Sequence, residues 1–212
     1  MTDYVRISRD WEGYPVVCIA SGTSLMDSDV AYVHEMRKRD KCRVIVVNNN
    51  YLKAPWADHL HCCDKQFIKW HIDNPVFSLI NMTRTTLSNE LEQPMIDLGF
   101  KILRISQSHG LCMGGDGVST GSNSGYQAVN IAALYGAKDI FLLGYDHKPS
   151  NDGRTHWFGN HPSPTESSVF DGFLAHWGTL PSELDKHGIR VVNCSPDTAL
   201  TMFEMKPITE CF

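Results

Sequence analysis

The sequence lacks a surplus of positive charge, a long apolar run and a regular cysteine pattern. Its 212 residues carry 19 Lys+Arg against 24 Asp+Glu, a formal net charge of -5. A protein that holds a nucleic-acid backbone by bulk charge needs a clear basic surplus, so we expect no binding of that kind. No stretch of about 18 apolar residues, as a membrane helix requires, is present. The polar start, residues 1–13, also lacks the apolar core of a signal peptide. These absences predict a protein of the cytoplasm with no membrane span.

The cysteines form no framework either. There are seven, an odd number, and no two are spaced as Cys-x-x-Cys, whereas a secreted disulfide scaffold has an even, patterned set. His59, His61 and Cys63 are of zinc-ligand types, but no second cluster stands at the spacing of a zinc finger or ribbon. We therefore predict free cysteines in a reducing compartment, and no metal site.

What the sequence does contain is an alternation of strand-like and helix-like segments. Hydrophobic residues at 42% and charged residues at 20% are ordinary for a globular protein, and the length suits one domain over residues 1–212. Alternating strands and helices predict an α/β, Rossmann-like fold, with a mostly parallel sheet and helices on both faces. The expected strands are 15–20, 43–47, 59–63, 77–80, 101–105, 139–143 and 190–194, and the expected helices are 27–39, about 126–135, and 168–187 with a break near Thr179.

Small and polar residues follow several of these strands. In open parallel sheets, ligands bind beyond the carboxyl ends of the strands, where such residues converge. N–H groups of a strand-to-helix turn can hold a phosphate, although ordinary helix capping by the same residues is an alternative. The sequence has neither Gly-x-Gly-x-x-Gly nor the P-loop pattern after its first strand, which disfavours NAD and P-loop chemistry. The predicted nucleotide-binding residues are Gly22, Thr23, Ser24, Asn48, Asn49, Asn123, Ser124, Gly125, Gly144, Tyr145 and Asp146.

Two histidines in the loop after Asp146 are the candidate catalytic residues. His156 and His161 stand in a polar, Gly/Pro-rich segment rather than in a core run. The pKa of histidine lies near neutral pH, so a loop histidine beside a nucleotide can act as a general base. The alternative for each is an ordinary surface histidine.

Several segments resemble one family in the same order. Ile-Ala-Ser-Gly-Thr-Ser-Leu at 19–25 resembles the I-x-G-x-G-P-S-L opening of the bacterial sialyltransferases typified by the Campylobacter lipooligosaccharide enzymes. It also resembles a wider Rossmann-like group, many from phages, that includes 6-hydroxymethylpterin pyrophosphokinases. The segments 124–126, 137–146, 156–161 and 193–200, together with Asn48, resemble further motifs of the sialyltransferases. Thr23 departs from that pattern by replacing a proline, and Asn160 is an extra residue before His161.

The resemblance implies a glycosyltransferase-like enzyme that uses a nucleotide-activated sugar with a CMP-type donor. It implies a CMP moiety held by Gly22, Ser24, Asn48, Ser124, Gly125 and Asp146. His161 or His156 would then take a proton from a hydroxyl of a small-molecule or glycan acceptor. No cofactor beyond the donor is expected, and the formation of a homo-oligomer is left open.

Two alternatives stand beside this interpretation. A pyrophosphokinase would move diphosphate from ATP to a pterin-like alcohol, with Mg²⁺ held by clustered carboxylates. A non-catalytic nucleotide-binding phage protein would bind without turnover. The carboxylates available for Mg²⁺ are Asp64, Asp116, Asp146 and Asp152.

Overall fold

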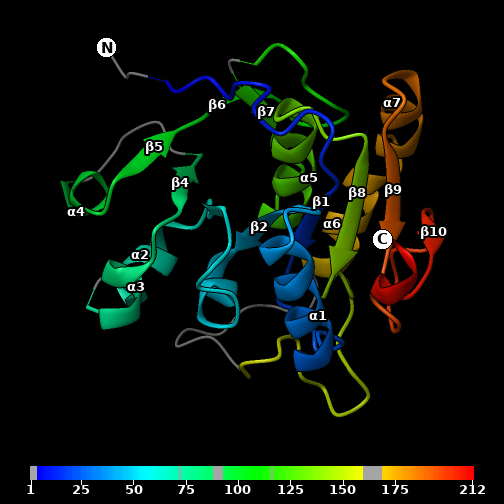
Figure 1. Ribbon diagram of the computed structural model, residues 1–212, viewed down its shortest axis with the longest axis horizontal. Helices are drawn as coiled ribbons and strands as arrows, with labels where there is room; N and C mark the ends of the chain where they lie inside the picture. Colours follow the sequence, from blue (N-terminus) through cyan, green and yellow to red (C-terminus); the bar gives the residue numbers. More distant parts are fainter. Residues whose placement is uncertain (1–3, 72, 88–92, 116, 160–168) are drawn as a thin grey trace.

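The computed structural model describes residues 4–71, 73–87, 93–115, 117–159 and 169–212. Its main feature is an eight-stranded sheet in the order β10-β9-β8-β1-β2-β3-β4-β5 (Figure 1). Every neighbouring pair in this sheet is parallel, as predicted. The strands are β1 (Val16–Ile19), β2 (Arg43–Val47), β3 (His59–His61), β4 (Thr83–Thr86), β5 (Phe100–Ile102), β8 (Asp139–Leu143), β9 (Arg190–Asn193) and β10 (Glu204–Met205).

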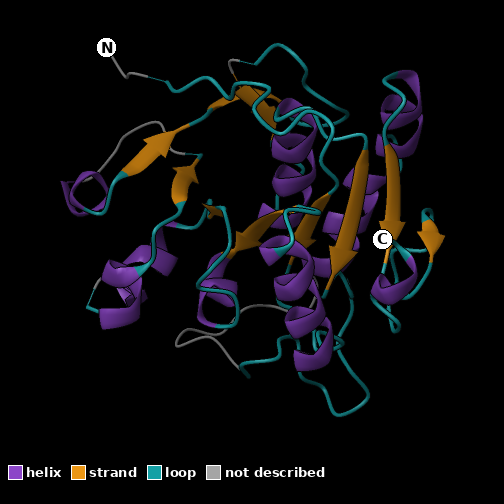
Figure 2. Cartoon of the chain, viewed as in Figure 1, coloured by secondary structure: helices purple, strands orange, loops and turns teal. Residues whose placement is uncertain are grey.

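Helices cover both faces of the sheet (Figure 2). In β1, Val16 and Cys18 pack into a core shared with α5, whereas Val17 and Ile19 pack into a separate core shared with α1. A strand buried on both faces must be apolar at every position, which explains the continuous apolar run. One face carries α1 (Asp27–Lys38), α2 (Lys65–His71), α3 (Pro75–Leu79) and α4 (Gln93–Asp97), and the other carries α5 (Ser124–Leu134), α6 (Val169–Trp177) and α7 (Leu180–Lys186). The Rossmann-like prediction is confirmed.

The strand order reverses in the middle of the sheet. From β1 the chain adds β2 to β5 on one side and later adds β8 to β10 on the other. The carboxyl ends of β1 and β8 therefore diverge into loops that run in opposite directions. In such sheets this switch point leaves a crevice for a ligand.

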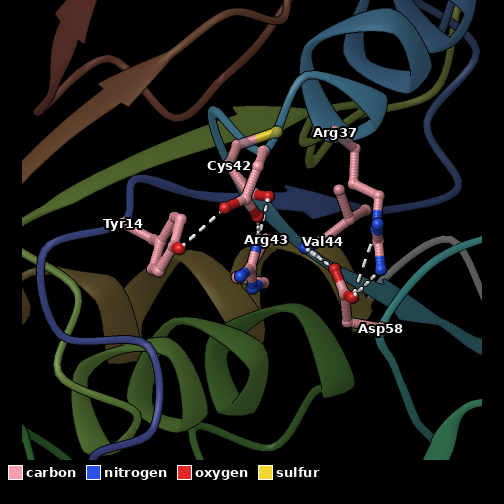
Figure 3. A network of polar contacts seen from close by, with 7 residues as sticks. Tyr14, Arg37, Cys42, Arg43, Val44 and Asp58 are labelled. Carbon is pink, nitrogen blue, oxygen red and sulfur yellow. Dashed lines mark hydrogen bonds and ion pairs between the residues drawn. The ribbon is translucent and has the colours of Figure 1, made fainter.

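A polar network ties the opposite end of the sheet together (Figure 3). The Asp58 carboxylate accepts hydrogen bonds from Arg37 of α1 at 2.7 Å and from the N–H of Val44 at 2.9 Å. Arg43 stacks its guanidinium on the Tyr14 ring, 3.8 Å from the centroid. These contacts join the end of α1 to the start of β2. They lie at the amino ends of the strands, whereas the crevice lies at the carboxyl ends.

Two strand predictions differ from the structure. Residues 77–80, predicted as a strand, belong mostly to α3, because Asn74 caps that helix by accepting a hydrogen bond from Val76 N–H at 3.0 Å and Pro75 opens it. Residues 101–105 are divided between β5 and β6 (Arg104–Gln107), and β6 pairs with β7 (Gly117–Ser119) in a second, two-stranded sheet. The predicted break near Thr179 is confirmed, since α6 ends at Trp177 and α7 begins at Leu180. The elements that were not expected are the strands β4, β7 and β10, the helices α2 and α4, and the 3-10 helices η1 (Asn48–Leu52) and η2 (Ile208–Glu210).

Candidate functional site

A cavity of about 540 Å³ lies at the switch point. It is bounded by the carboxyl ends of β1, β2, β3 and β8, by the first turn of α5, and by α6. Segments far apart in the sequence thus meet there, as the strand-end argument predicts. The predicted site residues that line it are Gly22, Asn48, Asn123, Ser124, Gly125, Gly144, Tyr145, Asp146 and His156.

Thr23 and Ser24 lie behind the cavity wall and bind Asp146. The Thr23 hydroxyl donates to the Asp146 carboxylate at 3.1 Å, and the Ser24 N–H donates at 2.8 Å. The Ser24 hydroxyl donates to the other carboxylate oxygen. Burial raises the pKa of Asp146, while the bonds from Ser24 and Thr23 oppose that rise. The Asp146 carboxylate therefore occupies the anion-binding position of the turn after β1, where the sequence predicts a phosphate.

The first turn of α5 offers donors that remain free. Asn123 caps this helix, its side-chain oxygen accepting from Tyr126 N–H at 2.8 Å. Within the described ranges, the N–H groups of Ser124 and Gly125 have no acceptor, and both residues line the cavity. Unpaired N–H groups at a helix start, together with the helix dipole, favour an anion. The better phosphate position is therefore α5, rather than the turn after β1.

Asn48 lies on the wall of the same cavity and has an unpaired side-chain oxygen. Its backbone is left-handed, with φ 50°, a region that asparagine tolerates better than most residues. The side-chain oxygens of Asn48 and Asn49 are buried and have no hydrogen-bond partner in the described structure. Such an oxygen costs about 1–3 kcal/mol unless a partner arrives. Asn48 lines the cavity and Asn49 does not, so of the two it is Asn48 that a ligand there would lie beside.

Trp157 connects the loop that carries His156 to the segments that follow β1 and β2. Its backbone N–H donates to the Ser21 carbonyl at 3.0 Å, and its indole N–H donates to the Asn50 side chain at 2.8 Å. His156 stacks on Phe158, with ring centroids 5.0 Å apart, and lines the cavity. The other predicted catalytic residue, His161, lies outside the described residues.

His147 is a cavity residue that the sequence analysis passed over. It follows Asp146 directly, has a left-handed φ of 51°, and packs edge-on against Trp177 with ring centroids 5.4 Å apart. Burial lowers the pKa of His147 to about 4, so its imidazole is neutral at neutral pH. Its position immediately after a strand end was the signal that could have identified it.

The remaining wall is apolar on one side and acidic on the other. Phe170 and Phe173 of α6 line the cavity, as does Asp64 after β3. Tyr145 contributes ring surface only, because its buried hydroxyl donates to the Gly125 carbonyl at 3.1 Å. Among the described residues no lysine or arginine lines the cavity. Two basic residues that are adjacent in sequence to cavity residues pair elsewhere, Lys148 with Asp197 and Arg154 with Asp152.

The histidines of β3 belong to the core rather than to the site. His59 bonds Thr85 at 2.7 Å and Tyr135 at 2.9 Å, and His61 bonds Thr85 at 2.8 Å and Gln127 at 2.7 Å. All four ring nitrogens are thus used within the protein.

In the described part of the chain, no helix is both long and apolar enough to cross a membrane.

Comparison with known proteins supports the fold. No protein-family model and no curated protein matches the chain. The chain is similar in structure to the MAf glycosyltransferase from Magnetospirillum magneticum AMB-1, with a TM-score of 0.64 and 16% sequence identity. The match covers 99% of this chain and 36% of that one, so this chain corresponds to a minor part of the larger protein. At this identity the similarity establishes a shared fold.

Proposed function

We propose that the chain is a glycosyltransferase-like enzyme that binds a nucleotide-activated sugar, with a CMP-type donor, in the switch-point cavity. The observation that carries the proposal is the pair of unpaired N–H groups on Ser124 and Gly125, two residues that line the cavity beside Asn48, whose buried side-chain oxygen has no partner. A nucleotide supplies both complements, an anionic phosphate and the N–H or O–H donors of its base and ribose. The fold shared with a glycosyltransferase agrees with this assignment.

In this arrangement the donor phosphate lies against the first turn of α5. The N–H groups there would stabilise the charge that develops on the nucleotide as the bond to the sugar breaks. Phe170 and Phe173 offer an apolar surface for a base or a sugar ring. A neutral histidine would accept the proton of the attacking hydroxyl. His156 and His161 are the first candidates for that step, and His147, whose pKa of about 4 makes it a weaker base, is the third.

A nucleotide screen tests the binding step. At a concentration of about 100 times Kd, a ligand of the native state adds about 2.7 kcal/mol, which raises Tm by several degrees. We expect CMP to raise Tm without Mg²⁺ in a thermal-shift screen that also includes UDP, GDP and ATP. Asn48→Gly should weaken CMP binding about 10-fold, the value of one hydrogen bond, without lowering the Tm of the free protein. No shift with any nucleotide would sink the proposal.

Turnover is tested on the histidines. Loss of a general base lowers the rate by about 100-fold or more while affinity persists. We expect this outcome for at least one of His147→Gln, His156→Gln and His161→Ala, measured as CMP release from CMP-sialic acid. Nucleotide affinity, measured by calorimetry, should stay within about twofold of that of the unchanged protein. His187→Gln, on an exposed residue at the end of α7, is the control. If all three site variants retain both affinity and turnover, as the control does, the base is not a histidine of this site.

One observation favours the pyrophosphokinase alternative. Asp64 and Asp146 line the same cavity, and carboxylate oxygens are the ligands that Mg²⁺ prefers. Asp146 already accepts hydrogen bonds from Thr23 and Ser24, which limits its capacity for a metal. Asp152 pairs with Arg154 away from the cavity, and Asp116 lies outside the described residues. Stabilisation by ATP only with Mg²⁺ would favour this function, and binding without turnover would favour the non-catalytic one.

A further inference from the structure

Ser122 occupies an unusual turn at the rim of the cavity. It lies between the end of β7 at Ser119 and the start of α5 at Ser124, and it lines the cavity. Its φ of 58° is left-handed, a conformation that costs a non-glycine residue about 1–2 kcal/mol. The turn is fixed by the Ser122 N–H, which donates to the Thr120 hydroxyl at 3.1 Å. Ser122 is therefore an exposed serine held in a strained turn between a strand and a helix, without the Gly-x-Ser-x-Gly sequence of a nucleophile elbow.

Two histidines, His176 and His109, form a chain of hydrogen bonds that begins at the Ser122 hydroxyl. The Ser122 hydroxyl lies 3.1 Å from Nε2 of His176 in α6, and Nδ1 of His176 lies 2.8 Å from Nδ1 of His109. The two imidazole rings are stacked, with centroids 4.9 Å apart. When Ser122 donates to Nε2, His176 carries its own proton on Nδ1 and donates it to His109. A nucleophile, a base within hydrogen-bond reach and a third group that orients the base are the signature of nucleophilic catalysis.

We propose that Ser122, His176 and His109 form a second catalytic centre that hydrolyses small carboxylic esters. Phe170 and Phe173 on the wall of the same cavity suit an apolar acyl group. A neutral imidazole in the third position stabilises an imidazolium less than a carboxylate does, so activated esters rather than amides are the substrates. Ser122 and His176 are the catalytic residues, and His109 is a positioning residue.

The reaction balances with water as the co-reactant. The Ser122 oxygen bonds to the ester carbonyl carbon while its proton passes to Nε2 of His176. The bond to the alkoxy oxygen then breaks, and the alcohol leaves with that proton. Water attacks the acyl-serine, gives one proton to Nε2, and releases the acid as that proton returns to the serine oxygen. The free N–H groups of Ser124 and Gly125 are the available donors for the oxyanion, so a bound nucleotide phosphate would compete with the ester.

The test combines covalent labelling with ester hydrolysis on the full chain. Diisopropyl fluorophosphate should label one serine, which peptide mass spectrometry should identify as Ser122. Hydrolysis of p-nitrophenyl butyrate should fall about 100-fold in Ser122→Ala and in His176→Gln. His109→Gln should be about 10-fold slower with a shifted pH profile, a shift that a merely structural role would not produce. Ser108→Ala, at an exposed serine of the loop after β6, is the matched control, and Tm values verify that each variant folds.

Two outcomes would overturn the proposal. One is labelling that misses Ser122, or spreads evenly over several serines, in protein with the normal Tm. The other is ester hydrolysis by Ser122→Ala at the rate of Ser108→Ala. Neither measurement uses a nucleotide, so a negative nucleotide screen and a negative esterase test are separate results.

Discussion

Replacing Gly22 by alanine is expected to destabilise the protein by about 3 kcal/mol, the upper range for overpacking a close contact. A Cβ at this position would lie 2.6 Å from the carbonyl oxygen of Gly144 and closer still to the Asp146 carboxyl group. The end of β1 and the end of β8 touch there, and Gly22 N–H donates to the Gly144 carbonyl at 2.8 Å. A backbone oxygen cannot rotate away as a flexible side chain can, so the two strand ends must separate.

Gly172 supplies the matched control. It lies inside α6, and a Cβ built on it meets nothing within 4 Å. Alanine in a helix interior is favoured over glycine by about 0.5–1 kcal/mol, so Gly172→Ala should be neutral or stabilising. Urea unfolding at neutral pH measures both free energies. Equal stability of the two variants would mean that β1 and β8 do not meet as described.

Acidification is expected to remove about 3 kcal/mol of stability through His61 alone. Complete burial lowers the pKa of His61 to about 4, and burial likewise places the pKa of His59 well below its ordinary value. The unfolded chain takes up these protons near pH 6.5, before the folded chain does. The stabilisation is therefore fully present above about pH 6.5 and is lost as the pH falls toward 4.

A pair of variants isolates this effect. His61→Gln should be less stable at pH 7, because it disturbs the bonds to Thr85 and Gln127. Its unfolding free energy should nevertheless fall less steeply between pH 6.5 and 4.5, since one titrating group is gone. His187→Gln, at an exposed position, is the control variant. Parallel slopes for all three proteins in chemical denaturation would contradict the assignment of His61.

The sequence predicts the central strands β1, β2 and β8 well because they are buried on both faces of the sheet. Continuous apolar runs such as 44–47 have few other interpretations, and the polar residues after them converge because parallel strands end at one edge. Residues 77–80 lacked such a constraint, since a four-residue apolar run has no measurable period. The Asn74 side chain caps this segment at its amino end and so favours a helix there.

The candidate site was predicted where local rules apply and missed where packing decides. The strand-end residues Asn48 and Asp146 line the cavity because of their position in the sheet. The hydrogen bond from Ser24 N–H to Asp146 joins residues 122 positions apart in the sequence. No local sequence pattern could therefore predict it. Phe170 and Phe173 reach the site only because α6 packs across it. The alternation of β3 places His59 and His61 on one face, but only the docking of α5 makes that face interior.

The shortage of basic side chains around the cavity has a kinetic consequence. In the described ranges its donors are N–H and hydroxyl groups rather than lysine or arginine. Dipoles attract an anion strongly at contact but weakly at a distance, whereas fixed charges draw it in from beyond a Debye length of about 8 Å. The chain carries a formal net charge of -5 and Asp64 lines the cavity, so an anionic ligand would approach without electrostatic attraction, and added salt should not slow its association. Ligands would therefore be distinguished by their dissociation rates rather than by their association rates.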